Sequence, residues 1–245
     1  MKKTLLPLAI SSLFTVLLPN PVLADQLPPK NHQTIQYEQY TAITDCSAHA
    51  TDLALATVMP DTPSLSRESS NYQIDQSLYS RCTQTSTAPY SFGLRRGQLI
   101  NSHFIGKTQK AYDEGYYMTN IVPMTVELYT GAWYQSDRII DCIKPNGKMT
   151  VIAGAIWEGA HAANGTLPTH GIPVPSAYFK IIKQGAYQGA WMIPNAKTST
   201  RETLPAWEVT VNDIENRIGY LIPAELDGQK NYHPDGWYHS ECVTQ

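Results

Sequence analysis

The fold is indicated first by one stretch, Tyr90-Ser91-Phe92-Gly93-Leu94-Arg95-Arg96-Gly97-Gln98-Leu99-Ile100-Asn101. It places two adjacent arginines and a glycine before an amide, Gln98, and then continues with apolar residues. Arg95 and Arg96 suit a phosphate or another anion, because a guanidinium group donates paired hydrogen bonds to such a ligand. The stretch is too short to define a fold alone, so its neighbours along the chain decide the interpretation.

Two further blocks follow it in order. The second block contains Met118-Thr119-Asn120-Ile121-Val122-Pro123, Leu128 and Gly131-Ala132-Trp133. The third contains Ile172-Pro173-Val174-Pro175-Ser176-Ala177-Tyr178-Phe179-Lys180, Ile193-Pro194-Asn195 and Val211-Asn212-Asp213-Ile214-Glu215-Asn216-Arg217-Ile218-Gly219. Over residues 34–225 the three blocks together resemble the DNA/RNA non-specific endonucleases, the ββα-metal or His-Me finger nucleases. The resemblance implies an α+β fold, a single domain whose central, mostly antiparallel sheet is flanked by helices.

The same resemblance implies a defined chemistry. In such nucleases a histidine acts as general base on the attacking water. A divalent cation, usually Mg²⁺, sits on an asparagine and stabilises the developing charge. An arginine holds the phosphate. Here the general-base position is Gln98, the metal-ligand position is Tyr129, and Arg95 replaces an acid, whereas Arg96 and Gly97 match the pattern.

These substitutions predict that no intact catalytic set remains. An amide does not titrate, and losing a general base typically costs about 10²–10⁴ in rate. A neutral phenol is a poor ligand for Mg²⁺, which prefers compact oxygen donors in octahedral geometry. Asp137 falls near the family's acidic position, and helical spacing places it in one stripe with Tyr129 and Trp133. We therefore expect no metal or other cofactor, and Mg²⁺ only if hydrolysis persists.

No histidine is expected to replace the missing base. His103 follows Gln98 by five residues, and odd spacing along a strand would point it to the opposite face. His161 and His170 fall in residues 159–175, a stretch rich in Gly, Pro and His that predicts a long surface loop. A lone histidine in such a loop is usually only solvated.

The beginning of the chain predicts export. Met1-Lys2-Lys3 precedes an apolar stretch from Leu5 to Leu18, and Ala24 is a small residue suited to cleavage. A membrane anchor is the rival interpretation, but the apolar part is shorter than the roughly 20 residues that a spanning helix needs. Residues 1–24 are thus interpreted as a signal peptide and residues 25–245 as one nuclease-like domain. No other stretch is apolar enough to span a bilayer.

The net charge of the chain mildly disfavours tight nucleic-acid binding. The whole chain has 18 basic and 21 acidic residues, and removal of Lys2 and Lys3 would leave a net charge of about −5. Non-specific nucleic-acid binders usually gain affinity by neutralising phosphates with Lys and Arg. A local groove can still be positive.

Four cysteines suggest two disulfides in an exported protein. Their spacing does not fit the short pairs of a zinc site. Three connectivities are possible, of which we favour Cys46–Cys82 with Cys142–Cys242. The predicted location is accordingly the periplasm or the medium outside the cell.

Pattern and composition also predict individual elements. Strands are expected at residues 36–43, 50–59, 149–156, 177–182 and 190–193, after a loose leader at 25–35. Leu128, Ala132, Ile139 and Ile143 predict a helix over residues 125–143, and residues 211–218 a second, ended by Gly219.

Three functions remain open. The favoured hypothesis is a pseudonuclease, which keeps the fold and binds nucleic acid or another anion through Arg95 and Arg96. The second is an active phosphodiesterase with an altered catalytic constellation. The third is a module for a periplasmic or extracellular protein partner, which the negative charge favours.

Overall fold

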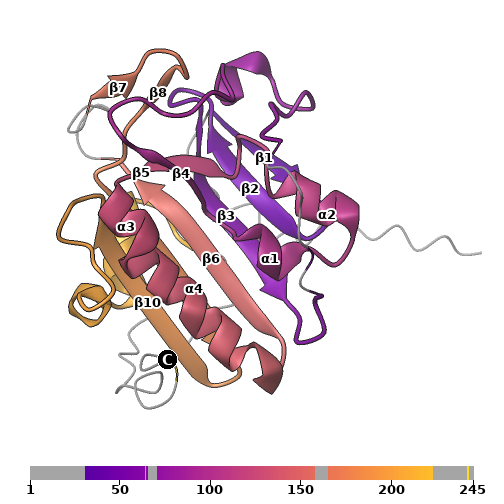
Figure 1. The fold of residues 1–245 in the computed structure, drawn as a ribbon, viewed down its shortest axis with the longest axis vertical. Coiled ribbons are helices and arrows are strands. Elements are labelled where there is room, and N and C mark those ends of the chain that lie inside the picture. The colour runs from indigo at the N-terminus through magenta and orange to yellow at the C-terminus, as the bar shows by residue number, and fades with distance from the viewer. Residues whose placement is uncertain (1–30, 64, 66–70, 158–164, 223–241, 243–245) are drawn as a thin grey trace, which may run out of the picture.

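A six-stranded antiparallel sheet, in the order β1-β2-β3-β6-β9-β10, forms the centre of the molecule (Figure 1). The computed structural model describes residues 31–63, 65, 71–157, 165–222 and 242. The predicted signal peptide and His161 lie outside these residues. The strands are β1 His32–Gln36, β2 Tyr40–Asp45, β3 Ala50–Val58, β6 Met149–Ile156, β9 Ala177–Gln184 and β10 Tyr187–Pro194.

Smaller elements surround the sheet. Two short strand pairs lie outside it, namely β4 Arg95–Gln98 with β5 Ile121–Met124, and β7 Thr166–Leu167 with β8 Ile172–Pro173. The helices are α1 Ser102–Ile105, α2 Gln109–Glu114, α3 Val126–Thr130, α4 Ala132–Ile143 and α5 Val211–Ile218. Short 3₁₀ turns are η2 Ser80–Cys82, η3 Lys144–Asn146 and η4 Leu204–Trp207. Within the described residues, no helix has the length and apolar character needed to cross a bilayer.

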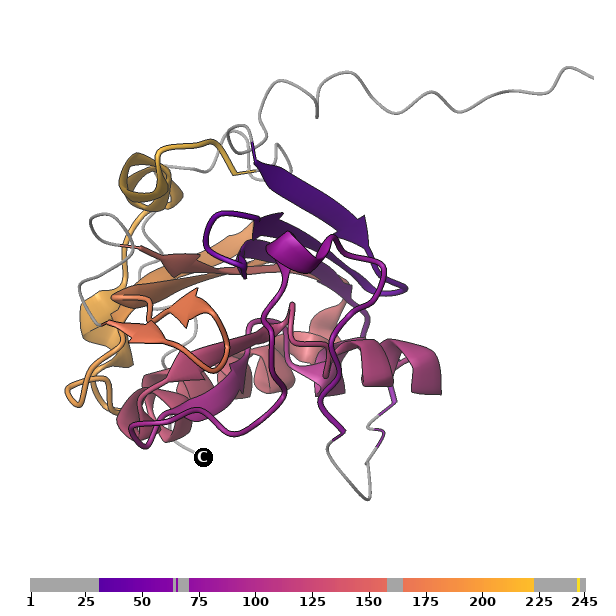
Figure 2. The same cartoon turned by 90° about the horizontal axis from the view of Figure 1, so that it is seen from above.

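Alternation along the strands gives the sheet two apolar faces. In β6, Val151, Ala153 and Ala155 pack in the cluster that contains the buried side of α4. Ile152 and Ile156 pack on the other face with residues of α5. Figure 2 shows the sheet between these layers, with α4 on one side and α5 on the other. The side chains of β6 on the α4 face are small, which leaves room for larger side chains from β9 and β10.

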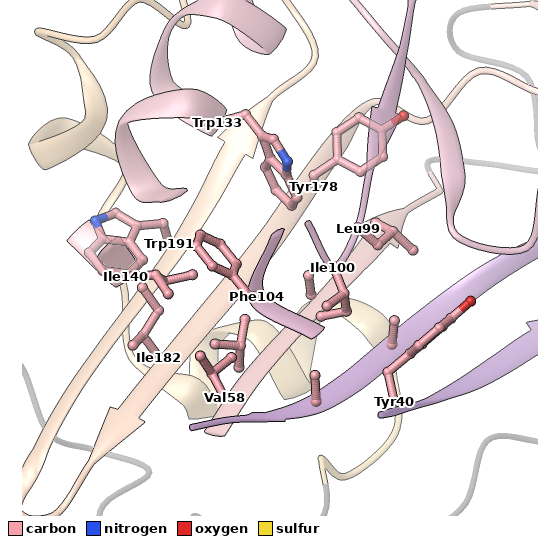
Figure 3. Close-up of a cluster of buried hydrophobic side chains, with 14 of the residues drawn as sticks. Tyr40, Val58, Leu99, Ile100, Phe104, Trp133, Ile140, Tyr178, Ile182 and Trp191 are labelled. Atoms are coloured by element: carbon pink, nitrogen blue, oxygen red, sulfur yellow. The ribbon is translucent and has the colours of Figure 1, made fainter. Parts of the chain in front are cut away.

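Large aromatic residues fill the layer between α4 and the sheet (Figure 3). The rings of Trp133 and Tyr178 meet edge to face, with centroids 5.8 Å apart, and Trp191 is fully buried. The hydroxyl of Tyr178 donates to the carbonyl of Pro123 in β5 at 2.6 Å. The core therefore also fixes the β4–β5 pair against the sheet.

The stretch Arg95–Gln98 forms β4 and pairs antiparallel with β5, in the register Gly97↔Val122 and Gln98↔Ile121. A Cβ atom on Gly97 would collide with the side chain of Met124. Any larger residue here would force the flexible side chain of Met124 to move, because β4 lies directly against it.

The predicted helix over residues 125–143 is wrong in its continuity. It is two helices, α3 and α4, separated at Gly131, although all four predicted core positions are buried, namely Leu128, Ala132, Ile139 and Ile143. The amide of Ala132 donates to the carbonyl of Ser199 at 3.0 Å. At the break, the first residue of α4 is therefore bonded to the loop that follows β10.

Other boundaries are confirmed or corrected. The strand predicted at 36–43 is confirmed for residues 40–43, which belong to β2, but it is not continuous, because residues 37–39 form a turn between β1 and β2. β1 begins inside the expected leader. Short strands β7 and β8 lie in the predicted loop. The helix at 211–218 and its stop are confirmed, with Gly219 left-handed at φ 79°. Its N-cap is Thr210, in a capping box with Asp213.

Both favoured disulfides are confirmed. Cys46 pairs with Cys82, which joins the β2–β3 turn to η2. Cys142 pairs with Cys242, which joins the end of α4 to a residue 100 positions later.

Candidate functional site

A hollow of about 370 Å³ lies where β4, α3, α4 and the loop after β10 meet. Its lining consists of aromatic, polar and charged side chains, namely Tyr72, Arg96, Gln98, Asn101, Tyr116, Tyr129, Thr130, Trp133, Tyr134, Asp137 and Arg201. Four of the five residues predicted for the site, Arg96, Gln98, Tyr129 and Asp137, are thus brought together. We call this hollow the β4–α4 pocket.

Strand geometry separates the two adjacent arginines. Successive side chains of a strand point to opposite faces, and only Arg96 lines the pocket, while Arg95 is exposed outside it. Arg96 Nη1 donates to the carbonyl of Thr87 at 2.9 Å. Its guanidinium carbon lies 3.8 Å from the ring centroid of Tyr72, in a cation–π contact. Arg96 is therefore held in place from two sides before any ligand arrives.

Gln98 uses both ends of its amide to hold neighbouring backbone. Nε2 donates to the carbonyl of Gly115 at 2.8 Å, and Oε1 accepts from the amide of Ser102 at 3.1 Å. These bonds join β4 to the first residue of α1 and to the end of α2. The side chain at the expected general-base position therefore has a structural role.

Tyr129 and Tyr134 form an exposed aromatic rim. Their side chains belong to α3 and α4, and they are 41% and 40% exposed, respectively. Trp133 lies deeper and is almost completely buried, and its indole N–H donates to the carbonyl of Gln98 at 3.0 Å. The pocket thus offers accessible rings at its mouth and a fixed ring in its wall.

Asp137 is the carboxylate of the pocket, and its charge is balanced from behind. Its Oδ1 accepts from Lys180 Nζ at 2.5 Å, and its Oδ2 accepts from Asn101 Nδ2 at 3.1 Å. Lys180 comes from β9, is 1% exposed, and lies 3.8 Å from the ring centroid of Trp133. Burial lowers the pKa of this ammonium group, and the carboxylate of Asp137 opposes that shift.

Asn101 places an amide in the pocket, but its oxygen serves another purpose. Oδ1 accepts from the backbone amide of His103 at 3.0 Å and so caps α1. With Nδ2 bonded to Asp137, both ends of this side chain are engaged.

Arg201 supplies the second arginine of the pocket, and it is exposed. Its Nε donates to the carbonyl of Thr130 at 3.1 Å, and its guanidinium carbon lies 4.6 Å from the ring centroid of Tyr134. Together with Arg96 and Lys180 it makes three side-chain cations around the single carboxylate of Asp137. The pocket is positive although the whole chain is acidic.

Sequence reasoning missed Lys180, Arg201, Asn101, Tyr72 and Tyr116. Only Lys180 had a local signal, since it interrupts an apolar strand in which its immediate neighbours are buried. The others depend on loops and helix ends whose positions are set by packing.

Two candidate histidines fall within the described residues, and both lie outside the pocket. His103 belongs to α1 rather than to a strand, and its Nε2 is 3.9 Å from a carboxylate oxygen of Asp141. His170 is buried, with Nε2 2.9 Å from the carbonyl of Ala88 and its ring against Tyr90. The expectation that His170 is a solvated loop residue is therefore wrong, since its contacts fix it in the core.

The fold, the β4–α4 arrangement and the sequence define one class. Residues 18–229 match the family model of the DNA/RNA non-specific endonucleases, so the chain belongs to this family. One chain of a crystal structure of the EndoG/EndoGI complex matches with a TM-score of 0.67 at 15% identity, over 77% of this chain and 84% of that chain. That likeness supports the fold.

Curated relatives include mitochondrial nucleases. The chain is 24% identical to the mitochondrial nuclease EXOG of Xenopus laevis over 186 residues, which are 70% of this chain and 52% of that protein. It is 22% identical to mitochondrial endonuclease G of Bos taurus over 169 residues, which are 64% of this chain and 56% of that protein. The matched region is thus about half the length of each of these relatives.

Proposed function

We propose that this protein is a pseudonuclease that binds single-stranded nucleic acid in the β4–α4 pocket without hydrolysing it. The main support for the proposal is that a glutamine, Gln98, occupies the expected general-base position and is held by hydrogen bonds to the backbone. Its amide cannot take a proton from water, and both of its ends already bond to backbone groups of Gly115 and Ser102.

The described donor set does not fit the divalent cation that the family implies. Mg²⁺ is usually held by one or two carboxylates in near-octahedral oxygen geometry. Among the described lining residues the only carboxylate is Asp137, which already accepts from Lys180 and Asn101. A cation on this carboxylate would lie close to the buried ammonium of Lys180, and the two positive charges would repel each other. We therefore propose binding without a metal or other cofactor.

Charge and aromatic surface support nucleic acid as the ligand. Arg96 and Arg201 can contact phosphate oxygens, and Tyr129 and Tyr134 offer rings on which bases stack. Stacking on aromatic side chains contributes about 1–3 kcal/mol per base and tolerates any base. A hollow of about 370 Å³ admits a single nucleotide more readily than a duplex.

We also propose that the protein acts outside the cytoplasm, in the periplasm or beyond the cell. Two disulfides support this location, because such bonds persist in oxidising compartments. The basic and apolar beginning of the sequence supports export by a signal peptide.

The test is fluorescence polarisation with a labelled oligothymidylate in EDTA at increasing salt. We expect binding without a cation, and an affinity that falls as salt rises. The double variant Arg96→Gln with Arg201→Gln should weaken binding at least tenfold. It should also reduce the salt slope by about one for each phosphate that is no longer neutralised.

Arg95→Gln is the matched comparison, because it removes the same charge from the neighbouring residue outside the pocket. We expect it to change affinity less than twofold. An equal loss in Arg95→Gln and in the pocket variants would mean that general surface charge binds the strand, and the pocket proposal would fail. If no binding occurs even at low salt, another anion or a protein partner becomes the better candidate.

An active phosphodiesterase is the second candidate, which family membership favours. Its test is digestion of plasmid DNA and RNA with Mg²⁺, Mn²⁺ and Ca²⁺. We expect no cleavage. Cleavage that EDTA abolishes would replace the pseudonuclease proposal with a working hydrolase.

A further inference from the structure

A second polar cluster lies at the end of the sheet, where β1, β2 and β3 run side by side. It consists of His32, Asp45 and Asp52, and one side-chain ligand atom from each lies within 4.8 Å of the others. His32 and Asp45 are directly paired across β1 and β2. The three side chains therefore come from three adjacent strands of one sheet.

A β-bulge brings Asp52 into this cluster. Ile43 pairs with Leu53 and Thr44 pairs with Thr51, so Asp52 is the extra residue of β3. A bulge redirects the side chain of the inserted residue, and bulges are common beside functional sites. The bulge interrupts the regular alternation of side chains along β3. The carboxylate of Asp52 lies beside His32 and Asp45 at this interruption.

Two donors already contact the Asp52 carboxylate. His32 Nε2 lies 2.7 Å from Oδ2, and the indole N–H of Trp157 donates to Oδ1 at 2.7 Å. Asp52 is buried, and Asp45 is partly buried. Two carboxylates and one imidazole thus lie close together, and Arg217 lines the same small cavity as Asp52.

A buried hydroxyl adds an independent observation. Tyr220 Oη is shielded from solvent and has no hydrogen-bond partner among the described residues. Tyr220 and Asp52 line the same small cavity, of about 70 Å³. Burial raises the pKa of the Tyr220 phenol, and the charges of Asp52 and Asp45 raise it further. The phenol therefore remains a neutral polar group with hydrogen-bonding capacity to spare.

We propose that His32, Asp45 and Asp52 bind one transition-metal cation of the Zn²⁺ type. One imidazole and two carboxylates suit Zn²⁺, with bonds of about 2.0–2.2 Å, whereas Mg²⁺ and Ca²⁺ prefer oxygen ligands alone. The fourth position of such a tetrahedral site is left for a water molecule. Ile43 and Leu53, which flank the bulge, pack on the α5 face of the sheet. The site is thus distinct from the β4–α4 pocket and ties three strands together.

Calorimetric titration of metal-stripped, tag-free protein with Zn²⁺ tests the proposal. We expect one Zn²⁺ per chain and a melting temperature that rises with Zn²⁺ concentration, because a ligand of the folded state stabilises it. Asp45→Asn should lower affinity at least tenfold. Its amide oxygen can still accept the hydrogen bond that Ser47 donates to Asp45 at 2.6 Å.

His32→Gln should lower affinity to a similar extent, and His103→Gln is the matched control. His103 is also close to a carboxylate, Asp141, but to only one in the described structure. We expect this control to bind Zn²⁺ as the parent protein does. Absence of Zn²⁺ binding, or binding by Asp45→Asn and His32→Gln as tight as that of the parent, would overturn the proposal.

A spectroscopic measurement covers the case in which a variant does not fold. Cobalt(II) bound to the parent protein should show visible bands of a four- or five-coordinate site, without a thiolate charge-transfer band, because all four cysteines are paired. A spectrum identical to that of octahedral aqueous Co²⁺ would also overturn the proposed metal site. Oligonucleotide binding by the pocket variants is measured separately, so the result for the metal site does not depend on the proposed nucleic-acid binding.

Discussion

Among single residues, Lys180 is a buried charge that depends on one ionic partner. Its ammonium is buried beneath the pocket and its partner is Asp137. Breaking a buried ion pair by removing one partner typically costs about 3–5 kcal/mol, because an uncompensated charge remains. Lys180→Met should therefore lower the free energy of unfolding by about that amount in urea denaturation.

A double variant separates charge balance from packing. Lys180→Met combined with Asp137→Leu should recover most of the stability, since no buried charge then remains. Lys183→Met, on the same strand but partly exposed, should cost less than about 1 kcal/mol. Equal destabilisation by Lys180→Met and Lys183→Met would refute this role.

The site residues differ in how far the sequence could predict them. Gln98, Tyr129 and Asp137 were assigned to one site through the resemblance to the nuclease family, and helical spacing supported only the stripe that Tyr129 and Asp137 share; all three line the pocket. The separation of Arg95 from Arg96 was also predictable, because neighbours on a strand face opposite ways. Arg201 was not, since nothing local indicates that a loop 64 residues after Asp137 returns to the same hollow.

Among the elements, the break between α3 and α4 controls the shape of the pocket. A Cβ atom on Gly131 would lie 2.8 Å from the Cα of Thr200 and would also collide with backbone oxygens of Glu127 and Ser199. Backbone atoms cannot rotate away as a flexible side chain can. Gly131→Ala should therefore cost about 1–3 kcal/mol of stability, as overpacking does.

The same substitution should also affect the pocket. The loop held against this break carries Arg201, whose Nε donates to Thr130 at the end of α3. We expect Gly131→Ala to weaken oligonucleotide binding in the polarisation assay, while Val126→Ala, on the exposed side of α3, changes neither property. Unchanged stability in Gly131→Ala would show that the loop moves without cost.

Helix and strand patterns in the sequence account for most elements but not for their interruptions. Leu128, Ala132 and Ile139 keep helical spacing through the break, so periodicity predicted one helix. What divides it is a contact with Ser199, which is remote in sequence. The bulge at Asp52 is similar, since it follows from pairing with β2 and leaves no local pattern in β3.

For the whole molecule, buried tyrosines predict a steep loss of stability at alkaline pH. Burial raises the pKa of Tyr37, Tyr40, Tyr90 and Tyr178 above the ordinary value near 10. They therefore stay protonated in the folded state while the unfolded chain ionises. Their contribution to the free energy of unfolding is complete below pH 10 and is lost as pH rises further. Well above pH 10 the loss approaches about 1.4 kcal/mol per pH unit for each tyrosine.

Lys180 has the opposite effect on the free energy of unfolding. Its pKa is lowered in the folded state, so its contribution to stability rises with pH up to about 10.5, the ordinary value for lysine. The pKa values of Tyr72, Tyr117 and Tyr220 are raised as well, so the tyrosines outnumber Lys180 and dominate. Between pH 10 and pH 11 each of the four tyrosines should cost about 1 kcal/mol, because the unfolded chain is already half ionised at pH 10. After the smaller opposing effect of Lys180, the free energy of unfolding should fall by about 3 kcal/mol, a large part of the 5–15 kcal/mol typical of a domain. Urea midpoints at pH 8, 10 and 11, with tyrosinate absorbance at 295 nm, measure this. Tyr90→Phe should make the loss of stability with pH less steep, whereas Tyr187→Phe, which is exposed, should change it less. Gradual ionisation of all tyrosines near pH 10 without loss of stability would show that the core admits the phenolate form.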